Sequence, residues 1–270
     1  MTVDVTAYFD RIGYGGASAP TLETLNALAA AHAQAIPFEN LDVLLGRGID
    51  LDPDAVFDKL VRRRRGGYCF EQNSLFLSVL TALGFRARPL SARVRLTTPP
   101  GQTPPRTHLF LAVEIDGQRW LGDVGVGALT LTSAIRFAPD EEQPTAHETR
   151  RIIRERDHWL HQARLGDVWA DVYEFTGEEM PPVDREVANW YTSAHPRSHF
   201  KDVLMVARAA PDGGRLSLRN RELKRRARDG SAEARTIATA EELLAVLAAE
   251  FALVFPPATR FGPPGSPWPA

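Results

Sequence analysis

The single cysteine of the chain, Cys69, is its most obvious candidate nucleophile. It follows Gly66-Gly67 in the stretch RRRRGGYCFEQN and stands at the start of an expected helix whose apolar positions continue to Leu83. The unsatisfied N–H groups and the positive dipole end of a helix N-terminus favour a thiolate, and so do nearby arginines. An inert thiol is the alternative, but such a thiol is more often found within an apolar stripe. We therefore predict a nucleophilic role for Cys69.

A nucleophilic cysteine requires a base, and the base requires an orienting acid. The dipeptide Asp116-Gly117 predicts a two-residue hairpin, whose register places His108 opposite Gly125 and Phe110 opposite Asp123. His108 and Asp123 are then diagonal neighbours on one face, with the imidazole within reach of the carboxylate. The sequence therefore predicts a catalytic triad of one cysteine, one histidine and one aspartate, as in cysteine proteases.

The remaining histidines do not suggest a metal site. Two pairs of histidines have spacings that do not allow them to bind one metal ion together. An expected strand would place the members of one pair on opposite faces, and a proline interrupts the helix that the other pair would need. The other two histidines are isolated in sequence, and a structural role is the simpler interpretation. These residues are His158 and His161, His195 and His199, and His32 and His147. We predict that the protein holds no metal, and a single cysteine excludes an intrachain disulfide.

The spacing of apolar residues changes along the chain, and this spacing predicts the elements that position the triad. Residues 1–85 show helical spacing, with helix starts at Thr21 and Asp52 and a helix end at Gly84. From residue 86 the period becomes two, in the stretches 88–96, 107–115, 118–124 and roughly 150–175. These strands predict an antiparallel sheet or barrel over residues 86–183, which would carry the histidine and the aspartate.

The last part of the chain, residues 184–270, shows both the helical spacing and the strand-like alternation of apolar residues. It predicts a short helix that opens at Asp184, a strand over 203–207, and a late helix with Thr239 and Glu242 in a capping box. The final stretch, residues 255–270, holds too many prolines for a regular element, and we expect it to lie loosely on the surface. The predicted fold class is therefore α+β, with a helical bundle, a β-barrel and an α/β lid.

Composition restricts the class of partner. The chain has 270 residues, of which 44% are hydrophobic and 24% charged, and its net charge is −2. These values exclude a disordered protein and do not favour nucleic acid or an anionic membrane as the partner. The sequence shows no apolar run of about 18 residues, and its first residues do not have the basic and apolar pattern expected of a signal peptide. We expect a cytoplasmic protein that acts on small molecules, and the sequence does not predict its oligomeric state.

Several motifs together resemble the arylamine N-acetyltransferase family. They are RGGYCFEQN, THLFLAV and WLGDVGVG, preceded by IPFENLDVLLG and followed by NWYTSAHPRSHF, and the resemblance runs from about Tyr8 to about Phe255. It implies a helical domain, a β-barrel and an α/β lid. It also implies xenobiotic metabolism by ping-pong transfer of an acetyl group from acetyl-CoA to an arylamine, arylhydrazine or arylhydroxylamine.

The resemblance assigns roles to individual residues. Cys69 matches the acetylated cysteine, His108 the base, and Asp123 the acid that orients the imidazolium. Phe38 and Phe200 match aromatic residues that line the acceptor pocket. The family places the arm of CoA near the loop that holds the two glycines of GDVGVG, Gly125 and Gly127.

One position departs from the family pattern. Val126 stands where most relatives have phenylalanine, so the space beside the thioester and the acceptor preference are expected to differ. This change keeps open a related activity, that of the amide synthases that release and cyclise a polyketide chain. A cysteine hydrolase or transglutaminase-like enzyme is a further alternative, because it would use the same triad on a peptide carbonyl.

Two basic stretches have simple interpretations. At least one arginine of the run 62–65 is expected to pair with a carboxylate such as Glu39 behind the cysteine loop. Residues 215–228 contain seven basic side chains, for which a solvated surface is the simpler interpretation and contact with CoA phosphates the functional alternative.

Overall fold

Helices dominate the N-terminal part of the computed structural model, which describes residues 3–96, 98–99 and 101–262. Two helix starts are capped as predicted, because the side chains of Thr21 and Asp52 accept hydrogen bonds from backbone N–H groups of the first turns. Gly84 has φ of +85° after the last of these helices, as a C′ glycine should. The helices are α1 (Val5–Ile12), α2 (Leu22–Ala35), α3 (Leu41–Leu44), α4 (Pro53–Phe57), a π-helical turn (Asp58–Arg62) and α5 (Cys69–Ala82).

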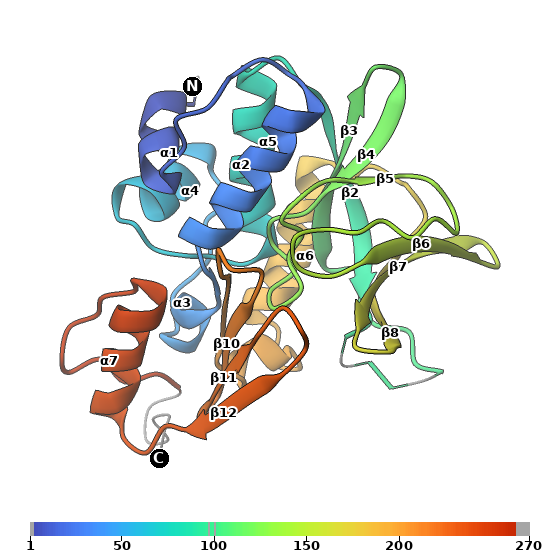
Figure 1. Ribbon diagram of the computed structural model, residues 1–270. Helices are drawn as coiled ribbons and strands as arrows, with labels where there is room; N and C mark the ends of the chain where they lie inside the picture. Colours follow the sequence, from blue (N-terminus) through green and yellow to red (C-terminus); the bar gives the residue numbers. More distant parts are fainter. Residues whose placement is uncertain (1–2, 97, 100, 263–270) are drawn as a thin grey trace.

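A seven-stranded antiparallel sheet follows and curls into a nearly closed barrel (Figure 1). Its strand order is β5-β4-β3-β2-β8-β7-β6. Beyond β5, isolated bridges from Pro139 to Ile152 and from Gln143 to Arg150 bring the chain back to β6. The strands are β2 (Arg86–Val94), β3 (His108–Ile115), β4 (Gln118–Gly122), β5 (Ile135–Arg136), β6 (Arg150–Glu155), β7 (His158–Leu165) and β8 (Val168–Phe175).

The β3–β4 hairpin has the predicted register, in which Glu114 faces Arg119 and Ile115 faces Gln118. The ladder ends, however, at the pair Leu111 and Gly122. The expected pairs of Phe110 with Asp123 and of His108 with Gly125 are therefore not ladder pairs, and the strand predicted over 118–124 stops two residues early.

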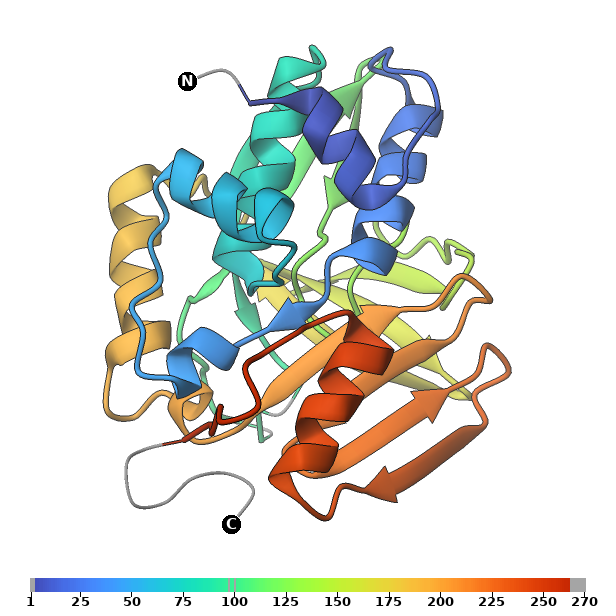
Figure 2. The same cartoon turned by 90° about the vertical axis from the view of Figure 1, so that its left-hand side faces the viewer.

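A second sheet, of order β1-β9-β10-β11-β12, forms the C-terminal part, and helix α7 lies across it (Figure 2). Leucine, valine and phenylalanine side chains of α7 pack on the sheet in one buried cluster, which includes Leu218 and Leu247. The elements are α6 (Pro182–Ala194), a 3-10 turn (His199–Lys201), β9 (Met205–Ala209), β10 (Arg215–Arg219), β11 (Glu222–Arg226), β12 (Ala232–Thr236) and α7 (Ala240–Phe251).

The edge strand β1 (Phe38–Glu39) of this sheet comes from the helical part of the chain. Phe38 pairs with Ala207 in β9 and also makes a parallel bridge with Gly67. Strand β1 thus joins the C-terminal sheet to the loop that precedes Cys69. A two-residue strand carries no periodicity, so the sequence did not indicate it.

Three predictions about the C-terminal part need correction. Helix α6 begins at Pro182 and not at Asp184, because proline suits the first turn of a helix. Strand β9 covers 205–209 and not 203–207. The stretch after α7 is not loose throughout, since Phe261 is fully buried and the N–H of Gly262 donates to the carbonyl of Leu44. Residues 263–270 of that stretch, and Pro100 in the predicted loop before β3, lie outside the described residues.

Among residues 3–96, 98–99 and 101–262, none of the helices has both the length and the apolar character that crossing a membrane requires.

Candidate active site

The candidate nucleophile Cys69 is the first residue of α5 and is 4% exposed. Its Sγ lies 3.6 Å from the carbonyl oxygen of Thr107, to which the thiol form can donate. The two glycines before it are required by packing. A Cβ on Gly66 would lie 2.2 Å from the carbonyl oxygen of Pro37, and one on Gly67 would lie 2.7 Å from a carboxylate oxygen of Glu71. The loop can therefore bring the thiol to the start of α5 only with glycine at both positions.

Buried ion pairs and hydrogen bonds hold the loop that contains Gly66 and Gly67. Oε2 of Glu71 accepts from the backbone N–H of Tyr68 at 3.0 Å, and its Oε1 lies 2.7 Å from Nζ of Lys59. Burial raises the pKa of Glu71 and the charge of Lys59 opposes this. Arg65 pairs with Glu39 at 2.7 Å. The expected pairing of one arginine of the run 62–65 with Glu39 is thus present.

His108 and Asp123 form a buried pair beside the thiol. Nε2 of His108 donates to Oδ2 of Asp123 at 2.8 Å, and the two residues are 1% and 0% exposed. Burial alone would lower the pKa of His108, but the charge and hydrogen bond of Asp123, together with the hydrogen bond and charge of Cys69, raise it to about 10. The imidazolium is therefore the stable form at neutral pH. The structure brings the three predicted triad residues together.

Asn73 is a site residue that sequence reasoning missed. Its Nδ2 donates to Oδ1 of Asp123 at 2.9 Å and to the carbonyl of Leu109 at 2.7 Å, while its Oδ1 accepts from the N–H of Val124 at 3.0 Å. Asn73 lies four residues after Cys69, so both side chains are on the same face of α5. That spacing was the only available signal, in the motif CFEQN.

The loop after β4 holds the residues predicted to approach CoA. A Cβ on Gly125 would lie 2.8 Å from Cα of Cys69, and the N–H of Gly125 donates to Oδ1 of Asp123 at 2.9 Å. Gly127 has φ of +87° and faces the ring of Phe38, which a Cβ would meet at 3.6 Å. Val126 is 7% exposed and belongs to the apolar cluster inside the barrel. The structure thus places Gly125 against the nucleophile and Val126 on the barrel side of the loop.

Two predicted acceptor-pocket residues lie in one aromatic cluster with Cys69. The rings of Phe38 and Phe200 are 6.4 Å apart, and the ring of Tyr68 is 5.6 Å from that of Phe200. The Tyr68 hydroxyl also donates to Oδ1 of Asn189 in α6. Residues distant in sequence therefore form one apolar wall next to the thiol.

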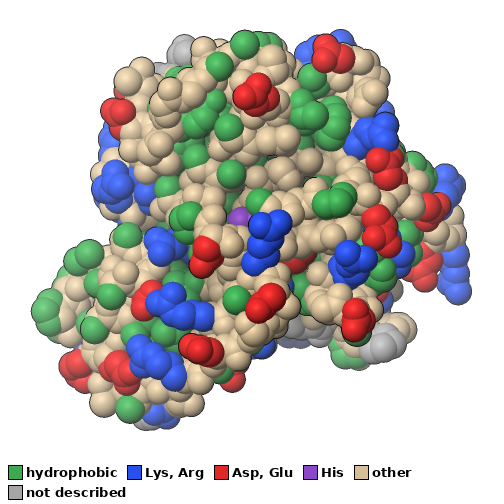
Figure 3. Space-filling view, viewed as in Figure 1, with side chains coloured by type: hydrophobic (Ala, Val, Ile, Leu, Met, Phe, Trp, Pro, Cys, Tyr) green, Lys and Arg blue, Asp and Glu red, His purple; other side chains and the backbone are tan. Residues whose placement is uncertain are grey.

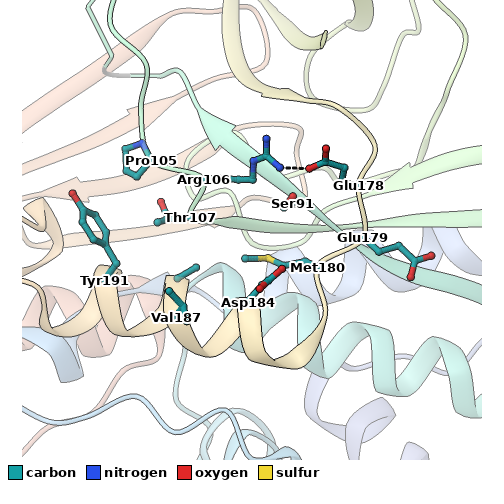
Figure 4. A pocket seen from close by; sticks show the side chains of 11 residues that line it. Ser91, Pro105, Arg106, Thr107, Glu178, Glu179, Met180, Asp184, Val187 and Tyr191 are labelled. Atoms are coloured by element: carbon teal, nitrogen blue, oxygen red, sulfur yellow. Dashed lines mark hydrogen bonds and ion pairs between the residues drawn. The ribbon is translucent and has the colours of Figure 1, made fainter. Parts of the chain in front are cut away.

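A pocket of about 350 Å³ lies between the loop that precedes β3 and helix α6 (Figure 4). Thr107, whose carbonyl accepts from Cys69, lines it, and so do Met180 and Ala188 from the apolar cluster that contains Cys69. Arg106 and Glu178 form an ion pair at this pocket. The pocket therefore reaches the immediate surroundings of the thiol.

Two other histidines, His32 and His147, are held in structural contacts. His32 lies between the hydroxyl of Tyr8 and the side chain of Gln72, and burial lowers its pKa to about 4. His147 lies between Thr132 and the carbonyl of Ala210. Within the part of the chain that the structure describes, no group of three or more His, Cys, Asp or Glu side chains is arranged to hold a metal ion.

The basic stretch 215–228 forms most of the β10–β11 hairpin. Arg215 is 5% exposed and pairs with Glu148, which also pairs with Arg226. The interpretation of this whole stretch as a solvated surface is therefore wrong for Arg215. Elsewhere on the face shown in Figure 3, basic and acidic side chains are interspersed.

The comparisons with known proteins identify the family. An N-acetyltransferase family profile matches residues 21–259. The arylamine N-acetyltransferase of Escherichia coli is 42% identical over 253 residues, which cover 94% of this chain and 90% of that protein. The chain belongs to the arylamine N-acetyltransferase family. The resemblance inferred from the motifs is therefore confirmed.

Solved structures of the family share the fold. The arylamine N-acetyltransferase of Mycobacterium tuberculosis is 44% identical with a TM-score of 0.89, covering 92% of this chain and 93% of that one. The Mycobacterium marinum enzyme, solved in complex with CoA, is 43% identical with a TM-score of 0.89, covering 92% of both chains. The family fold thus extends over both sheets and the helices that position Cys69.

Proposed function

We propose that the protein transfers an acetyl group from acetyl-CoA to the nitrogen of an arylamine, arylhydrazine or N-arylhydroxylamine through a thioester on Cys69. The observation that carries the proposal is the buried pair of His108 and Asp123, in which Asp123 and the neighbouring Cys69 at the start of α5 both raise the pKa of His108. An imidazolium that is stable at neutral pH can hold the sulfur as a thiolate. The named family members support the same activity.

In the first half-reaction the sulfur of Cys69 attacks the carbonyl carbon of acetyl-CoA. The bond from that carbon to the sulfur of CoA breaks, and CoA leaves as a thiol with the proton of His108. Asp123 keeps the imidazole oriented while its charge changes. The products are acetyl-Cys69 and a neutral His108.

In the second half-reaction the amine nitrogen attacks the thioester carbon. His108 takes the proton that the nitrogen loses, and the bond from carbon to Cys69 breaks to restore the ion pair. An arylamine suits this site because its lone pair is unprotonated at neutral pH, so the neutral imidazole is a sufficient base. An aliphatic amine would first have to lose a proton.

In this proposal, different residues around the thiol contact the acceptor and CoA. We assign Phe38, Phe200 and Val126 to the acceptor pocket and the loop of Gly125 and Gly127 to the CoA arm. Glycine lets backbone N–H groups approach an acyl or pantetheine group closely. In this proposal residues 1–85 carry the nucleophile, residues 86–183 the base and acid, and residues 184–270 the lid.

The intact mass of the purified protein after incubation with acetyl-CoA alone tests the thioester. We expect a gain of one acetyl group, which Cys69→Ala abolishes and which an added arylamine or hydralazine removes. Cys69→Ser should show almost no transfer, because a hydroxyl ionises far less readily than a thiol.

The alternatives predict different results. An amide synthase would leave the mass unchanged with acetyl-CoA although its thiol alkylates quickly, and it would accept a carrier-bound polyketide chain. A cysteine hydrolase would cleave peptides without CoA. A protein with neither an acetyl adduct nor rapid alkylation by iodoacetamide would contradict the nucleophilic role of Cys69.

A further inference from the structure

A buried cluster of charges joins the barrel to the C-terminal sheet. The carboxylate of Glu148 accepts from Nη2 of Arg150 and from Nη2 of Arg215, each at 2.7 Å on the same oxygen, Oε2. Its other oxygen accepts from Nε of Arg215 at 3.0 Å and from Arg226. Glu148 and Arg150 are 4% and 1% exposed, so this cluster is removed from water.

The cluster has more positive than negative charge. One carboxylate faces three guanidinium groups, of which only that of Arg226 reaches solvent to an appreciable extent, with 21% of its side chain exposed. Burial, with the charge of Arg215, lowers the pKa of the neighbouring His147 to about 4, so this side chain is neutral at pH 7. Buried charge without a partner is costly and is rarely tolerated.

Unpartnered polar atoms gather at the same place. Among the described residues, buried side-chain atoms without a hydrogen-bond partner include Nε and Nη1 of Arg150 and Nη1 of Arg215. Both ring nitrogens of His161 and the hydroxyl of Tyr173 are also buried without a hydrogen-bond partner. These four residues hold six of the eight such atoms, so the deficit of acceptors is local.

The sheet register places these residues next to one another. His161 is opposite Ile152 in β6 and opposite Tyr173 in β8, and its ring centroid is 4.7 Å from that of Tyr173. Arg150 is two residues from Ile152, so its side chain is a diagonal neighbour of His161 on the same face. Arg215 lies next to Arg150 because both guanidinium groups contact Oε2 of Glu148.

We propose that a small inorganic anion of the halide class, such as chloride, binds inside the protein between Arg150 and Arg215. Nη1 of Arg150 and Nη1 of Arg215 donate to it, and His161 and Tyr173 are the neighbouring polar groups. The available groups are mostly N–H donors and carry excess positive charge, which favours an anion over water alone. Because both arginines are at most 5% exposed, the nucleotide of CoA does not reach this place.

The anion would also support the loop that carries the acid of the candidate triad. Nη2 of Arg150 donates to the carbonyl of Leu129 at 2.9 Å, and the N–H of Leu131 donates to the carbonyl of Asp123 at 2.9 Å. Arg150 therefore connects the charge cluster with the loop between Asp123 and Leu131. By reducing the repulsion between Arg150 and Arg215, the anion would hold the guanidinium of Arg150 at that loop.

Thermal unfolding in sodium chloride, compared with sodium gluconate at equal ionic strength, tests the site. We expect a saturable rise in Tm of roughly 3–5 °C once chloride exceeds its Kd about tenfold. Arg215→Gln should lose the rise, whereas Arg86→Gln, on a side chain that is 82% exposed, should keep it. Glu148→Gln should make Tm depend more steeply on chloride, because the anion would then be the only negative charge in the cluster.

A second measurement uses the unaltered protein, in case the buried variants do not fold. Crystals soaked in bromide should show an anomalous peak within hydrogen-bond distance of Nη1 of Arg150 and Nη1 of Arg215. A peak without any saturable effect of chloride on Tm would indicate binding at crystal concentration only and would overturn the proposal. The absence of a peak, with water in its place, would overturn it as well.

Discussion

The side-chain amide of Asn73 donates to Oδ1 of Asp123 at 2.9 Å. Asn73 lies on α5, one turn after Cys69, so the helix that presents the candidate nucleophile also holds the acid of the candidate triad. The other oxygen of this carboxylate, Oδ2, faces His108. A rigid helix therefore sets the distance between the two ends of the triad.

Asn73→Leu should lower both stability and activity. It removes three buried hydrogen bonds and leaves the N–H of Val124 and one oxygen of Asp123 with fewer partners, at about 1–3 kcal/mol for each unsatisfied group. We expect Tm to fall by several degrees and kcat/KM for acetyl transfer to fall by roughly 10- to 100-fold. Ser78→Ala, on the same helix but away from Asp123, is the control. Unchanged kcat/KM in Asn73→Leu would show that Asp123 needs no support from α5.

The rate at which iodoacetamide alkylates Cys69 should depend little on pH between about 6 and 9. The pKa of His108 is raised to about 10, so the imidazolium keeps its positive charge near the sulfur over this range. In His108→Ala the partner charge is lost, and the rate should rise about tenfold per pH unit below pH 8.5, as for an ordinary thiol. A flat profile in this variant would eliminate the ion pair. Asp123→Asn should give an intermediate profile and a lower Tm.

Local signals account for what the sequence predicted well. The helix caps at Thr21 and Asp52 and the hairpin register at Asp116-Gly117 each depend on a few neighbouring residues. Extending this register predicted His108 beside Asp123, and the two residues do meet, although the ladder ends before them at Leu111 and Gly122. The placement of Cys69 followed from two glycines and a helix start.

Contacts between distant segments account for what the sequence did not predict. Strand β1 has two residues and joins β9 more than 160 residues later, so no periodic pattern could indicate the pairing. Glu148 meets Arg215 in the same way, across two sheets. Phe261 is buried although prolines surround it in sequence, because it fills a space beside α7 that only the assembled fold creates.

Gly125→Ala should lower both stability and the rate of acetylation of Cys69, although it adds only one methyl group. The new Cβ would lie 2.8 Å from both Cα of Cys69 and Nδ2 of Asn73, and neither the helix backbone nor the hydrogen-bonded amide can move freely. We expect destabilisation by about 1–3 kcal/mol and at least tenfold slower acetylation of Cys69. Gly122→Ala is a matched control, since its Cβ would meet only Phe76, at 3.8 Å. Equal behaviour of the two variants would contradict the role assigned to close packing.

Lys59→Met should be strongly destabilising, because it leaves the carboxylate of Glu71 buried without its cation. Breaking such a pair costs about 3–5 kcal/mol, which urea unfolding can measure. The double variant Lys59→Met with Glu71→Gln should recover part of this loss, since a neutral amide oxygen can still accept from the N–H of Tyr68.

The pH dependence of Lys59→Met separates lost charge pairing from lost packing. Burial already raises the pKa of Glu71, and without Lys59 only the hydrogen bond from the N–H of Tyr68 opposes this effect. The folded variant then binds a proton at a pH where the unfolded chain does not, so its stability falls as pH rises above the ordinary glutamate value of about 4.5. We expect the difference in unfolding free energy between the protein and the variant to be smaller at pH 5 than at pH 8. A difference that does not change with pH would show that Lys59 contributes mainly through the packing of its aliphatic chain.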